Sequence, residues 1–430
     1  MPNTTSEIVL EASGDGAAKA ARVAWLFPLL ARTHYWQPVF REFTRLIPRT
    51  AIFTGLWGGS APGYEGTFDV RLIKGARTVK LKNNNLGEAY ESTIFWAPLS
   101  IFRDLAQFRP DVIFTTGFGL WTLCALLHKL VRGCAVIVLW DGCSAYSSFQ
   151  ISWPRRLFRR LMAPFIDFGV SNMREGVEYM RVVLRVPEER LVAHPYQVAD
   201  LDILDSTAGD HCLPEKRRPV FLFVGAINAR KGWRYLLDAA ALLVKQGVNQ
   251  FSVVFVGAGE QEQELRSRIA DEGLAQVAHY AGPVPYHQIA SYYRESDVFV
   301  FPTTEDVWGL VLVEAMAFGL PVMCSKYAGA REMVKHGENG FILDPRDAEA
   351  FASYMADFIH EPSLLSNFGA RSRALMAPFT SIRAAEVLAG VALGSLQTRQ
   401  NQPGRDGVQR KQNSILRPLP TTEVPGRLKE

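Results

Sequence analysis

The sequence predicts an α/β protein with two Rossmann-like, doubly wound parallel-sheet domains that face a central cleft. Short apolar runs alternate with amphipathic helical segments along most of the chain, and this alternation predicts parallel sheets covered by helices. The alternation is interrupted once, near the middle, which predicts two domains in tandem. The length of 430 residues agrees, because one hydrophobic core rarely serves a chain of this size.

The first series of strands follows residues 1–20, which are predicted to be a disordered lead. Its apolar runs are 23–28, 51–54, 111–116, 135–140 and 168–171. They predict an N-terminal Rossmann-like domain over residues 21–205. Ligands of such sheets gather at the carboxyl ends of the strands, so the loops at those ends are the candidate sites.

The second series begins after residues 196–218, a stretch rich in Asp, Gly, Pro and charge, in which 206–218 are predicted to be the linker. Its apolar runs are 219–225, 251–257, 277–282, 298–301, 322–324 and 340–345. They predict a C-terminal Rossmann-like domain over 219–380. A helix is expected over 381–396, and the Gln-, Pro- and Arg-rich residues 397–430 are expected to form a disordered tail.

Composition and charge narrow the functional classes. Lys and Arg exceed Asp and Glu by four (47 minus 43), and the last 34 residues alone carry seven basic against three acidic side chains. The body is therefore neutral, and no nucleic-acid partner is expected. The five cysteines include no C-x-x-C pair, which favours a reduced, cytoplasmic compartment. The N-terminus has no basic region followed by an apolar core, so no signal peptide is predicted.

The most informative stretch is residues 298–325, which predicts a strand, a helix and a second strand. Val298–Phe301 are apolar throughout, and Pro302 stops the strand. Asp306 is a good N-cap for a helix over 307–318, and Gly319 is a plausible stop after it. The unit therefore places the N-terminus of a helix at the carboxyl edge of a parallel sheet.

Glu314 is the only charge on that apolar helix. A buried carboxylate needs a partner, and its side chain leans back toward the loop that holds Asp306. Free amides near Gly309 and Leu310, with the helix dipole, make an anion site there. An anion site flanked by carboxylates suits a ligand that joins phosphate to vicinal hydroxyls, such as a nucleotide sugar. The alternative is a capped helix whose Glu314 bonds neighbouring backbone.

A basic turn, residues 225–232, follows the first strand of the second series. Arg230 and Lys231 stand just before a helix, where two cations oppose the helix dipole. Their position makes sense when an anion neutralises them, and a leaving diphosphate needs such neutralisation. The alternative is a solvated basic loop.

These motifs resemble those of the retaining glycosyltransferases of family 4, the group 1 glycosyl transferases with the GT-B fold. In that family two acidic residues with seven between them precede E-A-M-A-x-G-x-P, and Asp306 and Glu314 have this spacing. Asp306 replaces the usual first Glu, and Glu305 lies one place upstream. Lys231 matches the family's G-R-L-x-x-x-K-G pattern, with Arg230 supplying the second charge. The resemblance covers 215–380 specifically and 22–205 loosely.

The resemblance implies transfer of a hexose, with retention, from a nucleoside-diphosphate sugar donor to a hydroxyl acceptor on a glycan, polysaccharide precursor or lipid-linked molecule. Lys231 and Arg230 would bind the diphosphate, Glu314 the ribose hydroxyls, and Asp306 or Glu305 the sugar. Neither a metal nor a cofactor is expected, and the 381–396 helix would cross back over the cleft. Further donor contacts are expected from Gly225, Asn228, Gly309, Leu310, Pro283 and Val284.

The N-terminal domain matches the family less well. Its first carboxyl-edge loop carries four residues expected on the acceptor side, unless the loop is packed by its own aromatics: Arg32, His34, Tyr35 and Trp36. Asp141 is also expected on the acceptor side, and the only ground for this expectation is its position in the sequence. Residues 151–168 set four arginines beside apolar residues, which indicates a surface helix with a solvated basic face or, as the alternative, a contact with the inner face of a membrane.

Two other functions share parts of this pattern. A GT-B nucleotide-sugar epimerase would have the same sheets and diphosphate site but no acceptor. A catalytically idle sugar-nucleotide-binding scaffold is the alternative that is not an enzyme, because Asp306 and Ala226 both depart from the family pattern.

Overall fold

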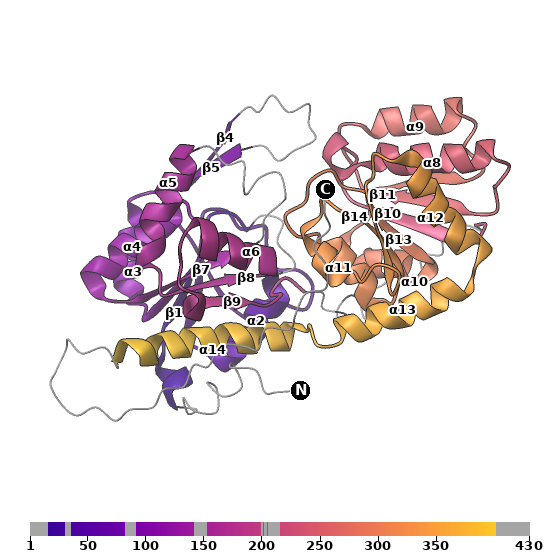
Figure 1. Cartoon of the computed structure of the whole chain (residues 1–430). Coiled ribbons are helices and arrows are strands. Elements are labelled where there is room, and N and C mark those ends of the chain that lie inside the picture. The colour runs from indigo at the N-terminus through magenta and orange to yellow at the C-terminus, as the bar shows by residue number, and fades with distance from the viewer. Residues whose placement is uncertain are drawn as a thin grey trace.

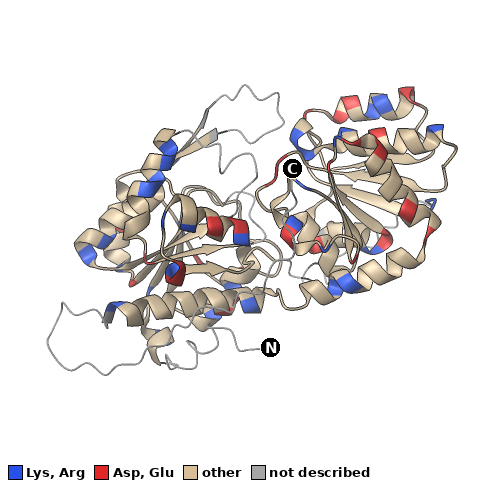
Figure 2. Cartoon of the chain, viewed as in Figure 1, with Lys and Arg blue, Asp and Glu red and all other residues tan. Residues whose placement is uncertain are grey.

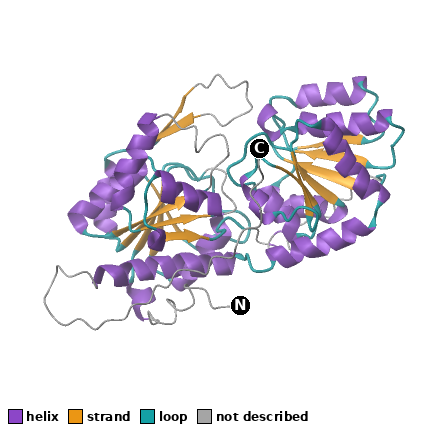
Figure 3. Cartoon of the chain, viewed as in Figure 1, coloured by secondary structure: helices purple, strands orange, loops and turns teal. Residues whose placement is uncertain are grey.

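The computed structural model describes residues 16–30, 36–81, 92–141, 153–198, 201, 204 and 216–400. Figure 1 shows two α/β lobes, an N-terminal one in indigo and magenta and a C-terminal one in pink and orange. Figure 3 shows strands inside each lobe and helices around them. The expected fold of two doubly wound parallel sheets is confirmed.

The N-terminal lobe has a seven-stranded sheet in the order β3-β2-β1-β6-β7-β8-β9, and every pairing in it is parallel. All five expected strands are present. The additional β3 and β9 lie at the two edges, where short and largely exposed strands lack an apolar run. The strands are β1 (Val23–Phe27), β2 (Thr50–Thr54), β3 (Asp69–Leu72), β6 (Val112–Thr116), β7 (Ala135–Trp140), β8 (Phe168–Ser171) and β9 (Leu191–Ala193).

Helices cover both faces of this sheet, and a separate antiparallel hairpin, β4 (Arg77–Leu81) with β5 (Ser92–Trp96), stands beside it. A mainly aromatic core around Trp25 and Phe114, whose rings stack with centroids 4.2 Å apart, fills one face. The helices and helical turns are α2 (Gln37–Leu46), α3 (Ser100–Phe108), α4 (Leu120–Arg132), α5 (Trp153–Met162), η2 (Ala163–Phe165), α6 (Arg174–Glu178), η3 (Tyr179–Val183) and η4 (Glu188–Arg190).

The C-terminal lobe has a six-stranded parallel sheet in the order β12-β11-β10-β13-β14-β15. The strand order reverses between β10 and β13, which makes their carboxyl ends the switch point where doubly wound sheets bind ligands. The strands are β10 (Val220–Val224), β11 (Ser252–Val256), β12 (Ala278–Gly282), β13 (Val298–Phe301), β14 (Val322–Ser325) and β15 (Gly340–Leu343).

Helices on both faces of this sheet bury its strands. The helices and helical turns are η5 (Ala229–Lys231), α8 (Trp233–Lys245), α9 (Glu262–Asp271), η6 (Tyr286–Gln288), α10 (Ile289–Glu295), α11 (Leu310–Ala317), η7 (Gly329–Met333), α12 (Ala348–His360) and α13 (Ser363–Met376).

The last helix, α14 (Ser381–Gln400), returns to the N-terminal lobe and lies along α2, as the yellow helix of Figure 1 shows. Its alanines Ala384, Ala385, Ala389 and Ala392 are fully buried there, because small side chains let the helix approach the sheet closely. Within the described residues, stretch 363–399 is long and apolar enough to cross a membrane, yet 56% of its most apolar window is buried. Packing onto the lobe accounts for that apolar character.

A part of each end that was predicted to be disordered is helical in the structure. Residues 16–20 are helical, although they belong to the predicted lead. Helix α14 continues to Gln400, four residues into the predicted tail. The remaining residues of the lead and the tail lie outside the described residues.

The two lobes touch through loops at the carboxyl ends of β8 and β14. The Glu332 carboxylate accepts hydrogen bonds from the backbone N–H groups of Arg174 and Glu175, both at 2.9 Å. Arg331 pairs with the Glu175 carboxylate. The Trp308 indole N–H donates to the Gln197 carbonyl at 3.1 Å. These contacts bring the carboxyl edges of the two sheets together.

Candidate active site

The basic turn after β10 and the polar turn after β13 are bound to each other across the switch point. The Arg230 carbonyl accepts hydrogen bonds from the Thr304 N–H at 2.8 Å and the Thr303 hydroxyl at 2.9 Å. Gly232 has φ 71°, and a Cβ there would lie 2.0 Å from the Pro302 carbonyl oxygen. Glycine is therefore required beside Lys231, because backbone from the two turns meets at this point.

Asp306 joins the two motifs electrostatically. Its Oδ2 lies 2.5 Å from Lys231 Nζ and 3.4 Å from Arg230 Nη1, and the residue is buried. Burial acts to raise the pKa of this carboxyl, but the ammonium and the guanidinium outweigh it and hold the pKa below its ordinary value. Asp306 is thus a carboxylate that orients two cations at the carboxyl edge of the sheet.

The neighbouring donor candidates support these cations. The Asn228 side chain accepts a hydrogen bond from the Lys231 N–H at 3.0 Å and caps the η5 turn. Arg230 Nη1 also donates to the Glu305 carbonyl at 2.8 Å, and Glu305 is buried. The ammonium of Lys231 lies 5.3 Å from the centre of the Phe301 ring. Each contact restricts where the two positive charges can lie.

The predicted capping role of Asp306 was wrong. Helix α11 begins at Leu310, and its N-cap is Gly309 with φ 106°. The Asp306 side chain is held by Lys231, and its backbone carbonyl accepts from the Gly329 N–H at 2.9 Å, so the chain stays extended there. A Cβ on Gly309 would lie 2.6 Å from the Phe301 ring, which makes glycine necessary at the start of this helix.

Glu314 lies on the buried side of α11 and accepts two tyrosine hydroxyls. Tyr286 donates to Oε1 and Tyr293 to Oε2, both at 2.8 Å. The expectation that this carboxyl needs hydrogen-bonding partners is confirmed, although the partners are side chains and not backbone. Burial raises its pKa to about 7, while the two hydroxyls favour the ionised form. Tyr293 is fully buried, whereas Tyr286 is 37% exposed.

Two glycine-containing loops hold the other residues that were predicted to contact the donor. A Cβ on Gly257 would lie 1.9 Å from the Gly225 carbonyl oxygen, so Gly225 sits in a close backbone contact with the loop after β11. The Tyr280 hydroxyl donates to the Gly257 carbonyl at 2.7 Å. Pro283 is exposed and Val284 is half-buried, both just after β12. All these loops follow the carboxyl ends of strands.

Asp141 follows β7 at the carboxyl edge of the N-terminal sheet. Its Oδ1 accepts hydrogen bonds from the Tyr196 hydroxyl at 3.1 Å and from Gln197 Nε2 at 3.0 Å. Asn172 Nδ2 donates to its backbone carbonyl at 3.1 Å. Burial raises the pKa of the Asp141 carboxyl to about 6, and the Tyr196 hydrogen bond acts against that rise.

Tyr196 and Gln197 had not been selected from the sequence. Both stand in the irregular stretch that precedes the predicted linker, yet both are buried. The sequence feature that could have identified these two residues is their position just after strand β9. This strand is too short to recognise from the sequence.

The acceptor-side prediction for Trp36 was wrong. Trp36 is 1% exposed and stacks on Tyr196, with ring centroids 5.1 Å apart. Its large apolar surface is used in the aromatic core, where it also contacts the rings of Trp25 and Phe27. Arg32, His34 and Tyr35 lie outside the described residues.

No group of three or more His, Cys, Asp or Glu side chains that would hold a metal ion was found within the described part of the chain. The positive charge at the switch point comes from Lys231 and Arg230.

Comparison with known proteins agrees with this geometry. The chain resembles HepE of Anabaena, solved in complex with UDP, with a TM-score of 0.64 and 16% identity over 89% of this chain and 100% of that one. A glycosyltransferase from Rickettsia africae gives a TM-score of 0.66 and 14% identity over 89% and 99% of the two chains. These likenesses show that the fold is GT-B.

Residues 212–375 match the model of the family described as glycosyl transferases group 1. The D-inositol 3-phosphate glycosyltransferase of Thermobispora bispora is 32% identical over 187 residues, which are 41% of this chain and 44% of that protein. The chain thus spans less than half the length of this relative. The family-model match over 212–375 includes Lys231, Asp306 and Glu314.

Proposed function

We propose that this protein is a retaining, metal-independent glycosyltransferase of family 4 that moves a hexose from a nucleoside-diphosphate sugar to a hydroxyl acceptor. The observation that carries the proposal is the meeting of Lys231, Arg230 and Asp306 at the switch point of the C-terminal sheet, with distances of 2.5 and 3.4 Å from the carboxylate to the two cations. Paired cations beside a carboxylate suit a pyrophosphate joined to a sugar.

In this mechanism Lys231 and Arg230 bind the pyrophosphate and stabilise the charge that develops as it leaves. Asp306 keeps both cations in place before the donor arrives and accepts hydroxyls of the sugar when it is bound. Glu305, held by its backbone to Arg230, is the second candidate for the sugar. By resemblance to the family, an oxygen of the donor phosphate takes the proton of the acceptor hydroxyl.

Glu314 would bind the ribose hydroxyls. A ribose hydroxyl would take the place of the Tyr286 hydroxyl, because Tyr286 is the exposed one of the two tyrosines that Glu314 contacts. Tyr293 would keep its own hydrogen bond and hold the carboxylate in position. Pro283 and Val284 would lie near the base, and Gly309 and Leu310 would offer amides to the phosphates.

The acceptor side is assigned to the N-terminal lobe. Asp141 lies at the carboxyl edge of its sheet, and the interlobe contacts bring that edge toward the donor site. Arg32, His34 and Tyr35 are proposed for the same side on sequence grounds.

We also place the protein in the cytoplasm, in contact with the inner face of a membrane through residues 151–168. Helix α5 carries Arg155, Arg156, Arg159 and Arg160 and no acidic residue, and Figure 2 shows its blue segments without red. Such a helix suits an anionic surface and a lipid-linked acceptor.

The test is a thermal-shift panel of UDP-, GDP- and ADP-glucose. A donor that binds only the folded protein raises the melting temperature, and we expect one of the three bases to do so. Lys231→Ala should lose that shift, whereas Lys245→Ala, a change at the end of α8, should keep it. The absence of a shift with every donor would contradict the proposal.

Product analysis separates the alternatives. Turnover that requires a hydroxyl acceptor supports the transferase, whereas an isomerised donor formed without an acceptor supports the epimerase. Donor binding with no product in either assay supports the idle scaffold.

A further inference from the structure

The N-terminal lobe carries an exposed apolar surface that the proposed reaction does not use. It consists of parts of α4, α5 and η2 and is here called the α4–α5 face. Scattered exposed apolar residues are common, but a contiguous group of this size marks an interaction site. Its exposed large apolar side chains are Leu127, Leu130, Val131, Leu157, Leu161 and Phe165.

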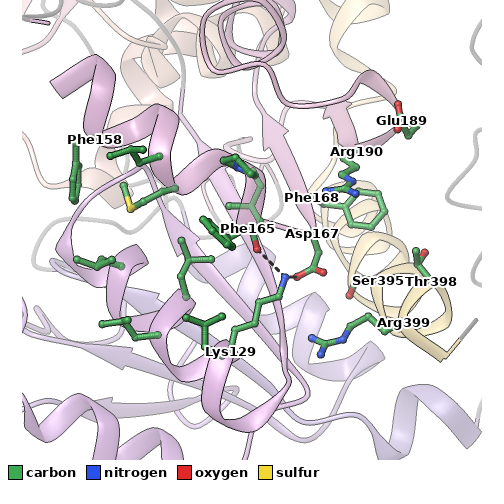
Figure 4. Close-up of a pocket in the computed structure, with 18 residues that line it drawn as sticks. Lys129, Phe158, Phe165, Asp167, Phe168, Glu189, Arg190, Ser395, Thr398 and Arg399 are labelled. Carbon is green, nitrogen blue, oxygen red and sulfur yellow. Dashed lines mark hydrogen bonds and ion pairs between the residues drawn. The ribbon is translucent and has the colours of Figure 1, made fainter. Parts of the chain in front are cut away.

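A cavity of about 720 Å³ opens in this face between α4, η2, the start of β8 and the end of α14. Figure 4 shows Phe158 and Phe165 on one side and Arg190, with Phe168 next to it, and Arg399 on the other, with the ion pair of Lys129 and Asp167 between them. Sites of this volume hold small-molecule ligands. The cavity therefore combines an apolar wall with a charged end where the cations Lys129, Arg190 and Arg399 outnumber the carboxylates Asp167 and Glu189.

The cavity lies at the edge of the sheet opposite the candidate active site. Phe168 is the first residue of β8, and the Asp167 carboxylate accepts the N–H of Val136 near the start of β7 at 2.7 Å. The proposed acceptor residue Asp141 follows the other end of β7. A ligand here is separate from the donor and the acceptor.

The charges around the cavity select the sign of its ligand. Helices α4 and α5 together contain six Lys and Arg and no Asp or Glu. The Lys129 ammonium is paired with Asp167 at 2.6 Å. Within the described part of the chain, Arg399 Nη1 is buried without a hydrogen-bond partner. Because a buried polar group needs a partner, this guanidinium is placed for an anion.

We propose that the cavity binds one anionic phospholipid of a membrane, with an acyl chain along the apolar wall and the phosphate on Arg399. This inference rests on the proposed membrane contact and deepens it, from a general surface attraction to a single lipid site. The exposed side chains of this face that also line the cavity enter the bilayer: Leu127, Leu130, Leu161 and Phe165. The exposed arginines of α5, Arg155 and Arg156, contact anionic headgroups.

The first experiment uses short-chain lipids below the concentration at which they form micelles. Calorimetric titration of the full chain with dihexanoyl phosphatidylglycerol should give one saturable site. Dihexanoyl phosphatidylcholine, which has the same chains without net charge, should bind at least tenfold more weakly, and glycerol 3-phosphate should show no binding. Equal affinity for the two lipids would overturn the assignment of the cavity to an anionic phospholipid.

Variants test the cavity itself. Arg399→Ala removes the cation and Leu161→Trp fills the cavity from a largely exposed position, and each should weaken phosphatidylglycerol binding at least tenfold. Arg371→Ala, which removes a surface arginine of the other lobe paired with Glu338, is the matched control and should bind as the wild type does. Melting temperatures verify that each variant is folded. Binding unchanged in both cavity variants would overturn the proposal.

Vesicles test the surrounding surface. Sedimentation with phosphatidylglycerol vesicles should fall at least fivefold in the double variant Leu130→Asp and Phe165→Asp, and it should persist in Val182→Asp, an exposed change outside the face. Equal sedimentation of all three proteins would contradict the proposal. The UDP-, GDP- and ADP-glucose thermal shifts should be unchanged in these variants, so failure of the lipid site is distinct from failure of the sugar-transfer proposal.

Discussion

The carboxyl edges of the two sheets each hold an aspartate, a buried Asp306 and a half-buried Asp141, and the pKa values of the two carboxyls are shifted in opposite directions. Asp306 in the C-terminal lobe is held by an ammonium and a guanidinium, and its pKa lies below its ordinary value in spite of burial. Asp141 in the N-terminal lobe accepts hydrogen bonds from a phenol and an amide, and burial raises its pKa to about 6. The groups that contact each carboxylate, more than its burial, decide the direction in which its pKa is shifted.

This difference fits a division of labour between the lobes. The C-terminal edge keeps fixed charges of both signs, as a site for a charged pyrophosphate must. The N-terminal edge keeps a carboxylate among neutral donors, as a site for a neutral hydroxyl does. Four predictions test this comparison.

The largest effect is expected at Lys231. Lys231→Ala should lower kcat for glycosyl transfer by about 100-fold or more, because it removes a positioned charge from the leaving diphosphate. Steady-state kinetics measures this loss, and Lys245→Ala is the control in the same lobe. A kcat within threefold of the wild type would place the diphosphate elsewhere.

The second prediction concerns pH and Glu314. Its pKa of about 7 in the folded protein exceeds the ordinary value of 4.5, so the stability that Glu314 contributes is present below pH 4.5 and is lost as the pH rises through 7. Between pH 5 and 8 this loss amounts to about 2 kcal/mol.

Glu314→Gln, which cannot ionise, should therefore gain stability relative to the wild type as the pH rises from 5 to 8. Denaturant unfolding at several pH values measures the change. A stability difference that is the same at pH 5 and pH 8 would show that Glu314 keeps its charge in the folded protein.

The third prediction addresses the N-terminal aspartate. Tyr196→Phe removes a hydroxyl that favours the ionised form of Asp141, so the pKa of Asp141 should rise from about 6 by about half a unit. If transfer requires an ionised Asp141, the acid limb of the pH–rate profile should move to higher pH by the same amount. Tyr354→Phe in the other lobe should leave it in place, and an unmoved limb in Tyr196→Phe would separate Asp141 from the reaction.

The smallest effect is expected where the two edges meet. Glu332→Ala removes the acceptor for the first two N–H groups of α6, which act as a cap supplied by the other lobe. We expect a loss of about 1 kcal/mol in the free energy of unfolding. Glu338→Ala, at a surface ion pair, should change stability by less. Equal losses of unfolding free energy in both variants would show that the interlobe cap stabilises the protein no more than a surface ion pair does.

Much of the fold was predictable because buried parallel strands are nearly continuous apolar runs. Val298–Phe301 and Ala135–Trp140 needed no tertiary information for their assignment. The edge strands β3 and β9 were missed because they bury little. The start of α11 was misplaced by three residues, because the residue that looked like its cap is held by Lys231, 75 positions away.

The sequence by itself determined the two parallel sheets, the buried acid of the apolar helix and the basic turn, because each depends on residues close together in the chain. Only the tertiary structure decided which groups hold those acids: two tyrosines for Glu314, two cations for Asp306, and Tyr196 with Gln197 for Asp141. It also moved Trp36 into the core and opened the cavity beside Arg399. The physical reason is that hydrogen bonds and ion pairs form between groups that folding brings together from distant positions, and local patterns do not record those distances.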